Sequence, residues 1–408
     1  MSSSTAPIPS DIEIGIICAL PKEANAVRAI MDVSSNGHQS QNIRSHSSSG
    51  TRPSGDNNSY TYGKIGPHHV VMAHVPGMGK VATSNVAANM ARTFGKMQLA
   101  LLVGLCGGVP DPQGESGAGA KLGDVVIGDS VAQYDLSKQL PDDRVRKRDV
   151  GDVIGRPDNR VRSFAAKLRS VGEELRRQTG EALAELVRGS PDLARKKLWD
   201  VVYEPDYWHL HRSGESSAAC RTCVPGERTC DGARAASCET LGCESWDDRN
   251  GVKRATSVRA SSLRPAVHFG TVACGDTVMK SGEHRDRVAR DTGAVALEME
   301  SAGVWDNLPC LAVKAVCDYA DSHKSKAWQE VASLAAAACA KVVLEQWTGT
   351  ENTSALPEAR QVNTANVDFS GTFSGGNNVG QVIGRNSYSS GKNNNFGSGT
   401  YNMGVPAW

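Results

Sequence analysis

The stretch "LALLVGL", residues 99–105, has no polar side chain at any of its positions. A run of this length without alternation is typical of a strand that is buried on both faces, as in a sheet with helices on either side. Apolar runs of similar length recur at residues 13–20, 68–75, 124–131, 267–274 and 310–316. These runs predict a sheet that is covered on both faces.

Helical patterns lie between the predicted strands. We expect helices over residues 80–94, through a periodic set of apolar residues from Val161 to Leu175, and over residues 326–347. Ser190 followed by Pro191 predicts another helix start. Strands alternating with helices predict an α/β layered domain with a mainly parallel or mixed sheet.

Charge and cysteine usage limit the classes of function. The 45 basic and 44 acidic residues give a net charge of +1, which offers no electrostatic case for binding nucleic acid or an anionic membrane. No apolar run approaches the roughly 18 residues of a membrane span, and the N-terminus lacks a signal-peptide pattern. Six cysteines occur singly in apolar segments, which predicts reduced thiols and a cytoplasmic location: Cys18, Cys106, Cys274, Cys310, Cys317 and Cys339.

Composition divides the chain into a core domain and appendages. We expect a flexible N-terminus over residues 1–10, one domain over 11–348 and a low-complexity tail over 349–408 that is rich in Gly, Asn and Ser. Two insertions interrupt the domain, a polar one at 33–59 and a cysteine-rich one at 206–262.

Six motifs occur in an order that resembles the nucleoside phosphorylase/nucleosidase superfamily. They are "IGIICALPKEANAV" (14–27), "LLVGLCGGVP" (101–110), "LGDVVIGD" (122–129), "FGTVACGDTVMKSG" (269–282), "ALEMESAGVW" (296–305) and "VKAVCDYADSHK" (313–324). The resemblance is to the branch with 5'-methylthioadenosine/S-adenosylhomocysteine nucleosidase and to fungal domains of this type in immune-receptor-like proteins. It implies a three-layer α/β/α fold with a central mixed sheet, a purine nucleoside or nucleotide as substrate, no required cofactor, and a homo-oligomer.

The resemblance also implies roles for individual residues. Cleavage of a purine–ribose bond needs a proton for the leaving base, and by resemblance Asp318 supplies it. Glu300 would accept hydrogen bonds from the ribose hydroxyls, and Met299 would pack against the sugar or base. Glu298 is expected to be structural. Glu23 would activate a water molecule.

The loop that contains Glu23 also helps to distinguish hydrolysis from phosphorolysis. Its loop "ALPKEAN" has no arginine, and only Lys22 could attract phosphate, which a carboxylate would repel. Hydrolysis is therefore favoured over the alternative, a phosphate-dependent phosphorylase. A structural alternative is that Glu23 stabilises the start of the following helix.

The remaining substrate-binding candidates depart in part from the family pattern. Cys106 and Gly107 belong to a glycine-rich loop in which Leu105 replaces a small polar residue. Val278 and Met279 replace the residues that often flank the base. These departures keep open a third alternative, a catalytically silent signalling module. We expect His323 and Lys324 to be solvated loop residues, with contact to a 5' phosphate as the alternative.

The cysteine-rich insertion has several interpretations. Five thiols lie within one short segment, and a CxxC pair with further cysteines can bind zinc. Reduced or redox-labile thiols and disulfides are the alternatives. The zinc candidates are Cys220, Cys223, Cys230, Cys238 and Cys243, with His209 and His211 nearby.

The tail also has two interpretations. It is either a flexible chain or a prion-like segment that forms cross-β stacks and recruits a protein partner with a matching motif.

Overall fold

A mixed sheet of eight strands forms the centre of the described part of the protein. The computed structural model describes residues 12–32, 53–110, 119–149, 151–211, 220, 222–224, 226–243 and 251–348. The strand order is β11-β10-β5-β12-β4-β1-β3-β2. The strands are β1 (Ile14–Cys18), β2 (Ser59–Ile65), β3 (His68–His74), β4 (Leu99–Gly108), β5 (Val125–Gln133), β10 (Val267–Cys274), β11 (Ala294–Glu298) and β12 (Cys310–Asp318). Most neighbours are parallel, whereas β2 runs antiparallel to β3 and β5 antiparallel to β12.

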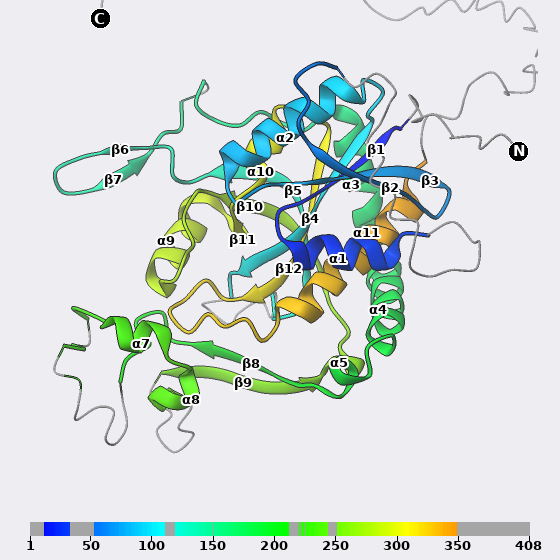
Figure 1. Ribbon diagram of the computed structural model, residues 1–408. Coiled ribbons are helices and arrows are strands. Elements are labelled where there is room, and N and C mark those ends of the chain that lie inside the picture. Colours follow the sequence, from blue (N-terminus) through cyan, green and yellow to red (C-terminus); the bar gives the residue numbers. More distant parts are fainter. Residues whose placement is uncertain are drawn as a thin grey trace, which may run out of the picture. The chain divides into compact units, whose positions relative to one another are not determined.

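Helices cover both faces of this sheet (Figure 1). One face shares a hydrophobic cluster with α1 (Pro21–Ile30), α3 (Asn159–Ser170), α4 (Gly172–Arg188) and α11 (Gln329–Gln346). The other face packs against α2 (Lys80–Thr93) and α10 (Ser301–Trp305), and α9 (Gly282–Thr292) covers the edge at β10 and β11. The predicted three-layer α/β/α class with a mixed sheet is confirmed.

Strand β4 shows why consecutive apolar residues are required. Leu101 and Val103 contribute to the cluster on one face, whereas Ala100 and Leu102 contribute to the cluster on the other. All ten residues of β4 are buried. Since a fully buried leucine side chain contributes about 1.5–3 kcal/mol, this strand stabilises both layers.

The sheet closes on itself at one end. Strand β11 pairs with β10 and also antiparallel with β4, through Ala296 opposite Gly108 and Leu297 opposite Gly107. Strands β4, β12, β5, β10 and β11 thus form a closed ring. Asp318 at the end of β12 is also in register with Gly107. The closure therefore brings the ends of β4, β11 and β12 to one place.

A second substructure lies beside the main sheet. Strands β8 (Lys197–Tyr203) and β9 (Val252–Arg259) form an antiparallel pair, with the short helices α7 (Asp231–Ala235) and α8 (Cys238–Leu241) at one end (Figure 1). The remaining short elements are α5 (Pro191–Arg195), the 3-10 turn Ala260–Ser262, and the hairpin strands β6 (Ser137–Gln139) and β7 (Arg144–Arg146).

The strand predictions agree with the structure, and two helix predictions differ in detail. All six predicted runs form strands. The periodic segment from Val161 to Leu175 is two helices, because the backbone at Val171 (φ −108°, ψ 25°) leaves helical geometry before Gly172. Ser190 precedes a helix of only five residues, and its side chain makes no capping hydrogen bond.

Parts of the predicted insertions belong to the ordered fold. Asp56 and Asn58, within the segment 33–59, are buried, and the Tyr60 hydroxyl donates to Asp56. Strand β9 lies within 206–262.

Residues 1–10 and 349–408 lie outside the described residues, as does most of 33–59. Among the described helices, none has the length and apolarity needed to cross a membrane.

Candidate active site

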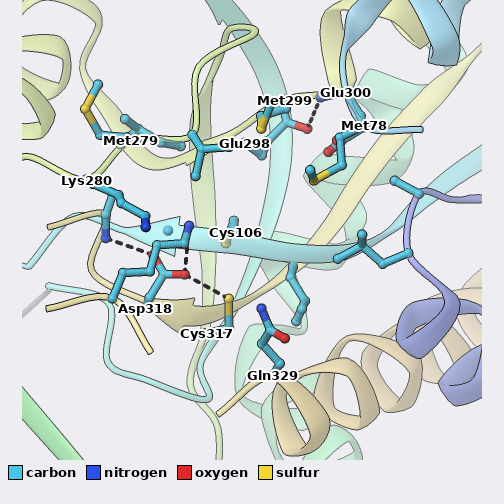
Figure 2. A pocket seen from close by; sticks show the side chains of 18 of the residues that line it. Met78, Cys106, Met279, Lys280, Glu298, Met299, Glu300, Cys317, Asp318 and Gln329 are labelled. Carbon is cyan, nitrogen blue, oxygen red and sulfur yellow. Dashed lines mark hydrogen bonds and ion pairs between the residues drawn. The ribbon is translucent and has the colours of Figure 1, made fainter. Parts of the chain in front are cut away.

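A cavity of about 330 Å³ opens where the ring closes. Its wall contains residues from the turn after β1, the end of β4, the segment after β11, and the end of β12. The cavity brings together Glu23, Cys106, Gly107, Val278, Met279, Met299, Glu300 and Asp318, which are all the catalytic and substrate-binding candidates of the sequence analysis. In the view of Figure 2, Glu300 and Asp318 lie on opposite sides, with Cys106 between them.

Glu23 is buried at the start of α1, with a side chain that faces both the helix and the cavity. The N–H groups of Ala19 and Leu20 donate to its Oε2 at 2.9 and 2.8 Å, and that of Leu105 donates to its Oε1 at 2.8 Å. The carboxylate therefore does contact the helix start. A β-carbon at Gly104 would lie 2.4 Å from Glu23 Oε1, so the close approach of β4 requires glycine there. Burial raises the pKa of Glu23, although Lys314 and the N–H donors oppose it.

Glu298 and Glu300 differ in their contacts. Glu298 accepts hydrogen bonds from the N–H groups of Glu300 and Ser301, at 3.0 and 2.9 Å for its Oε2, and so stabilises the start of α10. This contact agrees with the expected structural character of Glu298. Glu300 Oε1 receives a long contact of 3.5 Å from the N–H of Gly79, and both glutamates are buried.

A fully buried lysine, Lys314, links these carboxylates. Its Nζ lies 3.1 Å from Glu300 Oε2 and 3.6 Å from Glu298 Oε2. Burial lowers the pKa of a lysine, but Glu300, Glu298 and Glu23 outweigh that effect and raise the pKa of Lys314. The ammonium group partly neutralises three carboxylates that would otherwise repel one another.

Asp318 is held by three donors at the end of β12. Its Oδ1 accepts the N–H of Ala320 at 2.9 Å, and its Oδ2 accepts the Cys317 thiol at 3.2 Å. Lys324 Nζ lies 3.0 Å from the same Oδ2. Ala320 has φ of 53°, a left-handed conformation that is uncommon outside glycine.

The remaining candidates form the apolar part of the wall. Cys106 is buried, and burial raises the pKa of its thiol. Val278 is 45% exposed, which leaves it at the mouth of the cavity. Met279 and Met299 line the same cavity, and Met78 from the loop before α2 joins them (Figure 2). A cavity with polar groups at defined points and flexible thioethers elsewhere suits a flat, partly apolar ligand.

Two lysines of this site were not among the predicted catalytic residues: Lys314 was not singled out, and Lys324 was expected to be solvated, with contact to a 5' phosphate as the alternative. Lys314 is a basic residue within the apolar run of β12. A lysine in a strand predicted to be buried indicates a carboxylate partner nearby, and this signal was present in the sequence. Lys324 is only partly solvated, because its side chain is 27% exposed and forms an ion pair with Asp318. That pairing outweighs burial and raises the pKa of Lys324. His323 is also buried, and its ring stacks on Tyr203 with centroids 3.7 Å apart.

The cysteine cluster separates into two groups. Cys220, Cys223 and Cys230 lie around His211. Cys238 and Cys243 instead contact His209 Nδ1, at 3.6 and 3.3 Å from their sulfur atoms. The five sequence candidates therefore do not form one ligand set.

Comparison with known proteins identifies the superfamily of the chain. A family model described as the phosphorylase superfamily matches residues 13–190 and 233–346. The chain belongs to the phosphorylase superfamily.

Two relatives are similar to this chain over most of its length. A nucleotide-binding leucine-rich repeat-like protein of Hyaloscypha variabilis is 28% identical over 82% of this chain, which spans only 29% of that relative. The 5'-methylthioadenosine/S-adenosylhomocysteine nucleosidase of Mycobacterium bovis is 23% identical over 82% of this chain and 96% of that protein.

Solved structures of superfamily members resemble the chain at low identity. The Helicobacter pylori 5'-methylthioadenosine/S-adenosylhomocysteine nucleosidase has a TM-score of 0.48 at 15% identity and covers 83% of this chain and 99% of its own. Futalosine hydrolase of the same organism has a TM-score of 0.47 at 14% identity, with the same coverage.

Proposed function

We propose that this superfamily member hydrolyses the N-glycosidic bond of a purine nucleoside or nucleotide and releases the base. The observation that supports it is the convergence of Glu23, Glu300 and Asp318 on one cavity from three separate elements. Two carboxyl groups on opposite sides of a cavity can serve the two ends of such a substrate, the sugar and the base.

Asp318 is proposed to donate a proton to N7 of the purine as the C1'–N9 bond breaks. The electron pair of that bond then remains on a base that is less negatively charged and leaves more readily. General acid assistance of this kind contributes roughly 10²–10⁴-fold in rate. Ala320, Cys317 and Lys324 fix the orientation of the carboxyl group during the transfer.

Glu23 and Glu300 are proposed to act on the sugar side. Leu105 uses one acceptor position of Glu23 Oε1, and the remaining lone pair of that oxygen can accept the proton of the water that attacks C1'. Glu300 accepts hydrogen bonds from the ribose hydroxyls and stabilises the positive charge that develops on the ring. Lys314 holds Glu300 in place through its ion pair.

The charge distribution favours water over phosphate as the nucleophile. The described residues that line the cavity include no arginine, and Lys22 of the neighbouring helix start donates to Gln329 at 3.1 Å. The lining does include three lysines, Lys280, Lys324 and Lys326, of which Lys324 forms an ion pair with Asp318. Lys314 already faces three carboxylates. A phosphate dianion placed between Glu23 and Glu300 would be repelled by both carboxylates, whereas a neutral water molecule would not.

Chromatographic assay of base release tests the proposal. Adenosine, guanosine, inosine, methylthioadenosine and ATP are incubated with the full chain, with and without phosphate. We expect phosphate-independent release from at least one of them, and a loss of about 10²-fold or more in Asp318→Asn. Asp321→Asn is the matched control, because it changes a carboxyl group three residues further along that does not line this cavity. Release that requires phosphate would favour the phosphorylase alternative, and no release would favour the signalling alternative.

A further inference from the structure

His211, Cys220, Cys223 and Cys230 form a cluster near α7, outside the cavity described above. Their four ligand atoms all lie within 4.8 Å of one another, and all four side chains are half-buried. The individual separations are 3.6 Å for Cys220 Sγ to Cys230 Sγ, 3.5 Å for Cys223 Sγ to His211 Nδ1, and 3.7 Å for Cys230 Sγ to His211 Nδ1. No carboxylate belongs to this described group.

These separations match the edges of a zinc tetrahedron. Zinc binds thiolate sulfur at about 2.3 Å and imidazole nitrogen at about 2.0–2.1 Å, which gives tetrahedral edges of about 3.8 Å between sulfurs and about 3.5 Å between sulfur and nitrogen. Each observed distance agrees within about 0.2 Å. A disulfide would instead need sulfur atoms about 2.05 Å apart, whereas Cys220 Sγ and Cys230 Sγ are 3.6 Å apart and the four described cysteine and histidine ligand atoms lie close to one another as a group.

The surrounding backbone supports thiolates at these positions. The N–H of Cys230 donates to Cys223 Sγ at 3.4 Å, and the N–H of Ala233 donates to Cys230 Sγ at 3.3 Å. Between them the chain makes a tight turn, with Val224 and Arg228 exchanging backbone hydrogen bonds at 2.9 and 3.0 Å. Donors of this kind orient and stabilise thiolate ligands around a metal ion.

We propose that His211, Cys220, Cys223 and Cys230 bind one structural Zn²⁺ ion. Three thiolates and one imidazole fill a tetrahedral site, which leaves no position for substrate and indicates a structural role. All four residues lie between the two ranges that match the superfamily model, so the site is a feature of this chain's insertion.

This assignment changes the ligand set expected from sequence. Cys238 and Cys243 do not belong to it, since both contact His209 Nδ1, and His211 takes the fourth position.

The site would fix the insertion against the end of β12. His209, two residues before the proposed ligand His211, donates its backbone N–H to Ser322 Oγ at 3.0 Å. Ser322 lies four residues beyond Asp318 in the loop after β12. Zinc binding is thus expected to stabilise the insertion and to raise the melting temperature of the whole chain.

Metal content of the purified full chain is the direct test. Elemental analysis is expected to give one equivalent of zinc at this site, and Cys223→Ser and His211→Ala each lose that equivalent. Cys238→Ser is the matched control and keeps it, because Cys238 is a neighbouring cysteine outside the ligand set. Full zinc content in Cys223→Ser would overturn the assignment, as would a wild-type chain that neither contains zinc nor gains thermal stability when zinc is added.

Cobalt substitution keeps the test valid if the variants fail to fold. The metal-free wild-type chain is titrated with Co²⁺, and tetrahedral cobalt with thiolate ligands is expected to show strong thiolate-to-cobalt absorption and to release the cobalt to one equivalent of Zn²⁺. Absence of that absorption, together with a thiol count below the 11 cysteines of the chain, would identify a disulfide instead and contradict the proposal.

Discussion

At the scale of single residues, Glu23 combines burial with contacts that keep it in the cavity wall. Its exposed fraction is 3%, and burial raises its pKa above the usual glutamate range. A base must be deprotonated to accept a proton, so activity that depends on Glu23 is lost as pH falls through this raised pKa.

We therefore predict an acidic limb in the pH profile of kcat/KM that lies above the ordinary glutamate pKa of about 4.3. Glu23→Gln is the reference variant, and it is expected to lose about 10²-fold or more of the activity, because the amide cannot accept the water proton. Base release is measured across the acidic range with the best substrate. Full activity of the wild type down to the ordinary glutamate range would argue against Glu23 as the base.

At the scale of elements, β11 and α10 present two glutamates with different tasks. Glu298 Oε2 accepts two N–H groups around the start of α10, whereas the backbone contact of Glu300 within the described part of the chain is a long one of 3.5 Å. Both face Lys314, so their charge environments are similar. The pair is therefore a natural comparison between support of the fold and contact with substrate.

Substitution of each glutamate by alanine is expected to separate these tasks. Glu298→Ala should lower the free energy of unfolding by about 2 kcal/mol, because two buried N–H groups lose a charged acceptor. Glu300→Ala should mainly raise KM and lower kcat through loss of the ribose contacts. Denaturant unfolding and steady-state kinetics on both variants measure the difference. Equal effects of the two variants on stability and on activity would contradict the distinction.

The sequence predicts the features of these elements that depend on neighbouring residues, but not those that depend on contacts between distant parts of the chain. The uninterrupted apolar run of β4 identifies it as a central strand, because burial on both faces acts residue by residue. The pairing of β11 with β4 has no local signal, since Leu297 and Gly107 meet only after the ring has closed. His211 Nδ1 likewise lies 3.7 Å from Cys230 Sγ although the two residues are 19 positions apart in the sequence, so their proximity has no local signal. Strand β8 was not among the predicted strands, although exposed and buried residues alternate from Lys197 to Asp200.

At the scale of the whole molecule, the loop after β12 follows the cavity residue Asp318 and contains a buried carboxyl group, Asp321, whose ionisation affects the stability of the fold. Asp321, three residues beyond Asp318, is 7% exposed, and its carboxylate accepts the N–H of His323 at 2.9 Å. Burial raises the pKa of Asp321 to about 6, although Arg285 opposes the shift. The folded chain therefore binds this proton more tightly than the unfolded chain, in which an aspartate titrates near 3.9.

This difference predicts a pH-dependent loss of stability. The stabilisation is fully present below about pH 4 and is lost as pH rises through about 6, because the folded chain must then hold a buried negative charge. A shift of roughly two pKa units corresponds to about 3 kcal/mol. Relative to Asp321→Asn, which is neutral at every pH and can still accept the His323 N–H, the wild type should lose about that much unfolding free energy across this range. Denaturant unfolding at a series of pH values measures the difference, with the exposed Asp192→Asn as the control. Parallel stability curves for the wild type and Asp321→Asn would show that Asp321 ionises without cost, and that the loop beside Asp318 is open to water rather than packed as a rigid part of the fold.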